Sequence, residues 1–440
     1  MGLIGVMMAG CLYAQLPVND PKMSVFIGDL MSRMTLEEKI GQLNLLSVGF
    51  DVTGPQLSRD ADAKVRQGLV GGVFNTYTPV AVRKLQSLAI KESRLGIPLL
   101  FGYDVIHGHK TIFPMPLGLS CTWNLDLIER SARIAAAEAS ADGLNWTFSP
   151  MVDIARDPRW GRIAEGAGED PYLGAQIARA MVRGYQGGDL SRSNALMACV
   201  KHFALYGAAE AGRDYNTVDM SRRQMYEYYL PPYRAAVDAG AGSVMSSFNE
   251  VDAVPATANR WLLTDLLRTQ WGFQGFVVTD YTAINEMSEH GMGDLRTDAE
   301  LALKAGVDMD MVGETYLKYL PELAAHGEIS ESMINQACRR ILEAKYKLGL
   351  FADPFRGCTE ERARTEILTP ENRKAAREIA EQSFVLLKND RQTLPLKKSG
   401  TIALVGLLAD DQQNLLGSWR AAGDWRSAFG RGSAMWLAPQ

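Results

Sequence analysis

Eight short apolar segments, spread over residues 43–312, constrain the fold of this chain more than any other feature of its sequence. Most are rich in Val, Phe, Leu or Met, as buried strands are. Segments with the apolar period of a helix lie between several of them. Eight strands that alternate with helices predict a parallel (β/α)8 TIM-like barrel of the α/β class rather than an open doubly wound sheet. The eight strand-like segments are residues 43–48, 70–74, 98–105, 145–154, 196–203, 242–249, 275–281 and 306–312.

Two long helical patterns follow the last of these segments, at about residues 330–349 and 370–389. Residues 402–406 then have the pattern of a strand that opens a second α/β unit. Only 34 residues follow Gly406, too few to close a second core. The predicted parts are a leader (1–20), a catalytic barrel (21–350), a helical linker region (351–398) and a truncated second domain (399–440).

Composition narrows the classes of function. Apolar residues make up 47% of the chain and charged residues 22%, as in ordinary soluble enzymes. A net charge of −5 and the lack of basic tracts give no support for nucleic acid as a partner. The five cysteines are far apart, and His107 and His109 have no third partner nearby in the sequence, so neither a metal site nor any cofactor is expected.

The first 14 residues form an apolar run that is too short to span a bilayer. The run resembles the core of a secretory signal, although it lacks a basic start, and residues 8–11 loosely resemble a lipoprotein cleavage box in which Cys11 would carry lipid. We therefore expect an exported protein, periplasmic or lipid-anchored, with no transmembrane span. The alternative is a frayed apolar N-terminus.

Asp280 ends the seventh strand-like segment. Catalytic residues of parallel barrels lie at the carboxyl ends of the strands, so this carboxylate is a candidate nucleophile or base. The alternative is an Asp that caps the following turn or helix.

Polar residues also follow other strand-like segments, as the barrel prediction requires. Carboxylates accept hydrogen bonds from sugar hydroxyls, Lys and Arg donate to others, and aromatic faces stack on sugar rings. The set therefore suits a neutral polyhydroxylated ligand. Its members are Asp104, His107, Asp153, Lys201, His202, Ser246, Ser247 and Asn249, with Arg156, Arg159 and Arg162 in the loop after the fourth segment.

The chain contains five long motifs: GYDVIHG (102–108), NWTFSPMVDIARDPRWGR (145–162), DPRWGRIAEGAGEDPYLG (157–174), KHFALYGAAEAGRDYN (201–216) and GFVVTDY (275–281). Together these motifs resemble glycoside hydrolase family 3, in its bacterial β-glucosidase branch. The resemblance covers about residues 20–420. It implies a barrel followed by an α/β sandwich domain, and a retaining exo-acting β-glucosidase that removes terminal non-reducing β-D-glucosyl residues from a small β-glucoside or oligosaccharide.

The resemblance also implies a role for each matching residue. Asp280 would be the nucleophile, Asp104, Arg162, Lys201 and His202 would bind the sugar in the −1 subsite, Glu165 would orient Arg162 or Lys201, and Tyr281 would stack on a sugar ring. Lys201 or Arg162 is expected to lower the pKa of Asp280. The alternatives are a structural Arg162 paired with Glu165 or Asp157, and a Lys201–His202 pair that serves only the core.

The chain departs from the family in the residue that acts as general acid and base. In two-domain members of the family this residue is a Glu in the second domain. In the single-domain N-acetylglucosaminidases it is a His in the loop after the fifth strand, and the corresponding loop here, residues 201–207, has no second His. We therefore expect a C-terminally truncated member of the family. Two alternatives stay open: a sugar-binding but catalytically impaired chain, and a β-xylosidase on the same scaffold. Oligomeric state is not readable from the sequence.

Overall fold

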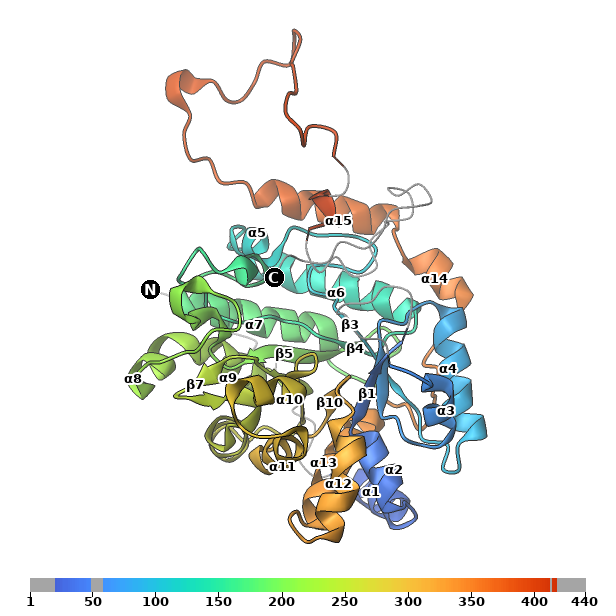
Figure 1. The fold of residues 1–440 in the computed structure, drawn as a ribbon. Helices are drawn as coiled ribbons and strands as arrows, with labels where there is room; N and C mark the ends of the chain where they lie inside the picture. Colours follow the sequence, from blue (N-terminus) through green and yellow to red (C-terminus); the bar gives the residue numbers. More distant parts are fainter. Residues whose placement is uncertain (1–19, 49–57, 412–413, 418–440) are drawn as a thin grey trace, which may run out of the picture.

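The computed structural model describes residues 20–48, 58–411 and 414–417. Eight strands form one sheet in the order β10-β1-β2-β3-β4-β5-β6-β9, and every neighbouring pair is parallel. Each predicted segment contains one of these strands, and the predicted (β/α)8 barrel is confirmed (Figure 1). The strands are β1 (Asn44–Ser47), β2 (Gly72–Phe74), β3 (Leu100–Tyr103), β4 (Trp146–Thr147), β5 (Met197–Phe203), β6 (Ser243–Ser246), β9 (Phe276–Val278) and β10 (Asp310–Met311).

The seam between β9 and β10 closes the barrel through a side chain. A single isolated backbone bridge joins this edge. The Val277 N–H donates to Oδ2 of Asp308 over 2.7 Å, and the Asp308 N–H donates to the Val277 carbonyl over 2.8 Å. Arg268 and Arg340 both form ion pairs with this buried carboxylate. The Asp308 side chain thus accepts a hydrogen bond that a backbone carbonyl would accept in a regular sheet. Its two arginine partners balance the burial of the carboxylate.

Helices surround the strands and bury the core between them (Figure 1). A capping box opens α2: the Thr35 side chain accepts from the Glu38 N–H, and the Glu38 carboxylate accepts from the Thr35 N–H. The main helices are α1 (Pro21–Ser32), α2 (Leu36–Gln42), α3 (Ala61–Arg66), α4 (Pro79–Glu92), α5 (Pro116–Ser120), α6 (Leu125–Ala141), α7 (Pro171–Gln186), α9 (Pro231–Asp238), α10 (Ala283–Glu286), α11 (Leu295–Ala305), α12 (Thr315–Ala325), α13 (Glu331–Lys347), α14 (Glu360–Glu366) and α15 (Pro370–Gln382).

The segment after α15 differs from the prediction in two respects. The helix predicted to reach residue 389 ends at Gln382, and residues 402–406 do not form a strand. The helix α15 packs against α6 and α5 and buries Ala375 and Ile379 there. The apolar side chains after Gln382 do not pack on the barrel in this way. Leu387 is 91% exposed and Val405 84% exposed. Figure 1 shows this segment extending away from the barrel, and a strand pattern without a partner strand is not sufficient for a strand.

The described helices include none that is both long and apolar enough to cross a bilayer. The predicted leader lies outside the described residues except for Asp20, whose side chain caps α1. The cysteines among the described residues, Cys121, Cys199, Cys338 and Cys358, are free thiols.

The seam yields a prediction for stability. Asp308→Asn keeps an acceptor for the Val277 N–H but leaves two arginines without their counter-charge. Removing one partner of a buried ion pair typically costs about 3–5 kcal/mol of unfolding free energy. We expect a loss of this size in urea unfolding. The control is Asp265→Asn, which removes an exposed partner of Arg260 and should cost less than about 1 kcal/mol. Equal effects of the two substitutions would contradict a special role for Asp308.

Candidate active site

Asp280 lies two residues beyond the carboxyl end of β9. Its Oδ1 accepts from the Tyr281 N–H over 2.7 Å. Its Oδ2 is buried and has no hydrogen-bond partner among the described residues. The residue that caps α10 is Thr282, not Asp280, so the capping alternative is wrong for that helix. One carboxylate oxygen is therefore held by the backbone while the other keeps its lone pairs for a ligand.

His202, at the end of β5, lies 3.6 Å from this oxygen through Nε2. Its Nδ1 and its backbone N–H both lie within 2.9 Å of Oδ2 of Asp153. Its Nε2 lies 2.9 Å from a guanidinium nitrogen of Arg162, which can only donate. Nδ1 therefore carries the proton and Nε2 is the acceptor. Burial, followed by the charges of Arg162 and Lys201, lowers the pKa of His202 well below its usual value, in agreement with a neutral ring.

Arg162 stands on the short helix η1 (Gly161–Glu165) and is held by Glu165 through two parallel hydrogen bonds of 2.8 and 3.0 Å. Burial alone would lower the pKa of Arg162, but the Glu165 carboxylate outweighs it and raises that pKa. The Arg162–Glu165 ion pair, on which the alternative of a purely structural Arg162 rests, is therefore present. Because the same guanidinium also bonds His202, the pair fixes Arg162 within the cluster.

Lys201 and Asp104 form a second buried pair. The Lys201 ammonium donates to Oδ1 of Asp104 over 2.7 Å, joining the end of β5 to the residue after β3. The side chains are only 3% and 11% exposed. The ends of β3 and β5, the two strands that flank β4, thus bring together residues that are 97 positions apart in the sequence.

The pKa of Asp280 differs from the prediction. The charges of Arg162 and Lys201 do lower it, as expected, but burial has the larger effect and raises it from 3.8 to about 6. The predicted net lowering is therefore wrong. A carboxylate with a pKa of about 6 is still mostly ionised at pH 7 and is more basic than an exposed one.

Sequence reasoning missed two residues that shape the site. The Tyr233 hydroxyl, on α9, lies 2.5 Å from Oδ1 of Asp153 and 2.7 Å from the His202 carbonyl. Glu286, at the end of α10, has its pKa raised to about 7 by burial and then by the charge of Asp280. The sequence does not indicate a site role for Tyr233, because its position fits the apolar face of a helix. Glu286 lies six residues after Asp280, on the helix that follows it, and this spacing could have indicated it.

The predicted stacking ring, Tyr281, is half-buried and packs edge-to-face against Phe74 with 6.1 Å between ring centroids. Trp146 and Trp160 are buried in the core. Among the described residues, no group of three or more His, Cys, Asp or Glu side chains could hold a metal ion.

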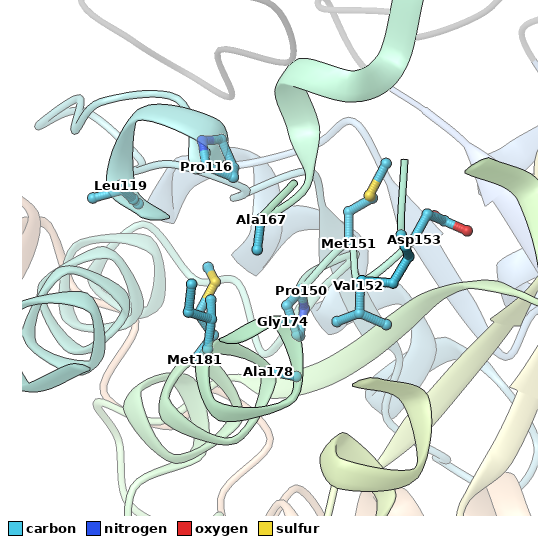
Figure 2. Close-up of a pocket in the computed structure, with 12 residues that line it drawn as sticks. Pro116, Leu119, Pro150, Met151, Val152, Asp153, Ala167, Gly174, Ala178 and Met181 are labelled. Atoms are coloured by element: carbon cyan, nitrogen blue, oxygen red, sulfur yellow. The ribbon is translucent and has the colours of Figure 1, made fainter. Parts of the chain in front are cut away.

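A small apolar pocket lies beside the polar cluster (Figure 2). Pro150, Ala167 and Met181 line it, and Figure 2 shows the Asp153 side chain at its edge with the carboxyl pointing away. Its free volume of about 10 Å³ is near the minimum for one water molecule. The pocket is thus a packing gap behind the site and offers no room for a sugar.

Fold and cluster together define an enzyme-type (β/α)8 barrel. At the carboxyl ends of its strands lie paired charges and the carboxylate of Asp280, whose Oδ2 has no hydrogen-bond partner among the described residues. The family model described as "Glycosyl hydrolase family 3 N terminal domain" matches residues 35–344. The chain belongs to glycosyl hydrolase family 3.

Individual relatives agree with this membership. The chain is 47% identical over 417 residues to the periplasmic beta-glucosidase of Salmonella typhimurium, covering 94% of this chain and 54% of that protein. It is 34% identical over 423 residues to a beta-xylosidase of Formosa agariphila, with coverages of 92% and 54%. The solved beta-glucosidase of Listeria innocua in complex with isofagomine has a TM-score of 0.86 and 43% identity, over 91% of this chain and 56% of that one. The chain therefore spans about half the length of these relatives.

The buried network yields a second stability prediction. Tyr233→Phe removes the donor to Oδ1 of Asp153 and leaves a buried oxygen unsatisfied, which costs about 1–3 kcal/mol. We expect this loss in urea unfolding at pH 7. The matched control is Tyr172→Phe, whose ring is 74% exposed and whose hydroxyl loss should leave stability nearly unchanged. Identical unfolding of both variants would show that the Tyr233 hydroxyl holds nothing in place.

Proposed function

We propose that the chain carries the nucleophile and sugar-binding half of a retaining, exo-acting β-glucosidase. The observation that supports this most directly is the free Oδ2 of Asp280 within 3.6 Å of a neutral His202. Similarity to proteins named as β-glucosidases supports the substrate class. The ligand is a small β-glucoside or oligosaccharide with a free non-reducing glucose.

In the proposed reaction, Oδ2 of Asp280 attacks the anomeric carbon as the bond to the leaving oxygen breaks, giving a covalent glycosyl-enzyme. An alkoxide leaving group takes its proton from a general acid, whereas a nitrophenolate leaves as the anion. Water then adds to the anomeric carbon, giving its proton to a base, and the ester to Asp280 breaks. Two displacements at one carbon retain its configuration.

The buried cluster has the donors and acceptors to hold the sugar during this reaction. Asp104 accepts from hydroxyls that Lys201 can also reach, because the two groups are 2.7 Å apart. Arg162 is fixed by Glu165 and can only donate. Hydrogen bonds that strengthen as the ring becomes an oxocarbenium-like species would contribute to the rate.

A xylosyl substrate is the second candidate, favoured by the 34% identity to a beta-xylosidase of Formosa agariphila. We propose glucose as the preferred sugar because identity is higher to the proteins named as β-glucosidases. We also propose export, supported by the apolar start of the sequence and by the periplasmic relative from Salmonella typhimurium.

Covalent trapping tests the proposal. A dinitrophenyl 2-fluoro-β-glucoside carries a leaving group that needs no acid, and its fluorine slows hydrolysis of the ester. We expect one label per chain, placed on Asp280 by peptide mass analysis, and slower labelling by the matching xyloside. Asp280→Asn should not be labelled, while the matched carboxylate variant Glu286→Gln should be. Label on any other residue would overturn the assignment, and faster labelling by the xyloside would reverse the proposed specificity.

The pKa of Asp280 gives a pH prediction. The nucleophile must be ionised, and burial raises its pKa to about 6. For nitrophenyl β-glucoside, kcat/KM should therefore be level at about pH 7 and fall below about pH 6, approaching tenfold per pH unit. Circular dichroism at each pH controls for unfolding. A rate that stays level down to about pH 4.5 would show that burial does not raise this pKa.

A further inference from the structure

A row of aromatic rings leads from the buried cluster to the surface. The Tyr206 ring packs edge-to-face against His202, with 5.2 Å between centroids, and against Tyr215, at 6.2 Å. Tyr215 packs in turn on Phe248 at 4.6 Å. Tyr206 and Phe248 are buried, but Tyr215 is 47% exposed. Tyr215 is thus the outer end of a packed aromatic row whose inner end contacts the site.

The exposed end also lies near the nucleophile. The pKa of the Tyr215 hydroxyl is raised, first by burial and then by the negative charges of Asp280 and Glu286. These two carboxylates come from residues after β9 and at the end of α10. The ring contacts lead to the same place, because Tyr215 packs on Tyr206, Tyr206 packs on His202, and His202 lies 3.6 Å from Oδ2 of Asp280.

The loop that carries Tyr215 is fixed on both sides. The Glu210 N–H donates to the Thr217 carbonyl over 3.0 Å and closes the loop. The Thr217 hydroxyl donates to Glu250 over 2.9 Å, and the other oxygen of Glu250 lies 2.7 Å from His290, in the segment after Asp280. The ring is therefore held in place before any ligand binds, which limits the entropy cost of a stacking contact.

We propose that the exposed face of Tyr215, supported by Phe248, is the surface on which the leaving group of a β-glucoside stacks. The inference rests on the proposed function, because it takes the buried cluster as the place of the glucose. An exo-acting enzyme buries the non-reducing sugar, so the leaving group points outward, past Asp280 to the exposed ring. Tyr281, for which the sequence also predicts stacking, packs edge-to-face against Phe74. Tyr215 then determines specificity for leaving groups with a flat ring face.

Binding of two inert ligands tests this without turnover. Phenyl β-thioglucoside and methyl β-thioglucoside share the glucose and differ in the ring beyond the anomeric carbon. By calorimetry we expect the full chain to bind the phenyl ligand about 5- to 10-fold more tightly. Tyr215→Ala should remove this advantage and leave methyl thioglucoside binding unchanged, whereas Tyr215→Phe should keep both. The control Tyr172→Ala removes an exposed ring outside the row and should behave as the unaltered chain.

The outcomes separate this inference from the proposed function. If both ligands bind and Tyr215→Ala keeps the phenyl advantage, the inference fails and the proposed function stands. If Tyr215→Ala weakens both ligands equally, Tyr215 contacts the glucose or supports the fold, and the inference also fails. If the unaltered chain binds neither ligand, the proposed function fails and the inference with it.

Discussion

The position of Asp280 depends on how the barrel closes. Asp280 lies two residues beyond β9, and the edge between β9 and β10 is joined by one isolated bridge and by the carboxylate of Asp308. Arg268 and Arg340 form ion pairs with that carboxylate inside the wall. The two arginines therefore balance the burial of the Asp308 carboxylate. The hydrogen bond from the Val277 N–H to Asp308 holds the strand that leads to Asp280. The side chain of Asp308 thus contributes both to stability and to the position of Asp280.

Charges in the site are arranged around a neutral histidine. His202 uses Nδ1 to bond Asp153 and Nε2 to accept from Arg162, so it connects a buried acid to a fixed cation without carrying charge itself. Lys201 and Asp104 form a separate pair. Oδ2 of Asp280 accepts no hydrogen bond from any of the described groups. The cations are close enough to favour its ionised form, and burial is strong enough to keep it basic.

The sequence predicted the barrel because strand period and helix period are local signals, and all eight strands followed them. It predicted the residues at strand ends because topology alone brings Asp104, Lys201, His202 and Asp280 to one face. It could not predict Tyr233, which reaches Asp153 across 80 positions from the interior of a helix. It also gave the wrong sign for the pKa of Asp280, since charges can be counted from residues but burial cannot. The predictions of a helix beyond Gln382 and of a strand at 402–406 were wrong. Both elements need a surface or a strand to pack against, and the local sequence pattern does not show whether one is present.

The segment after α15 has a consequence for how the molecule behaves in solution. Phe384, Leu387, Leu404 and Val405 are among its exposed apolar side chains, each at least 77% exposed. Apolar side chains gathered on one extended stretch promote contact between molecules when two such stretches meet. Among the described residues, the apolar side chains most open to contact with another molecule are therefore concentrated on this segment, away from the buried charged cluster of the barrel.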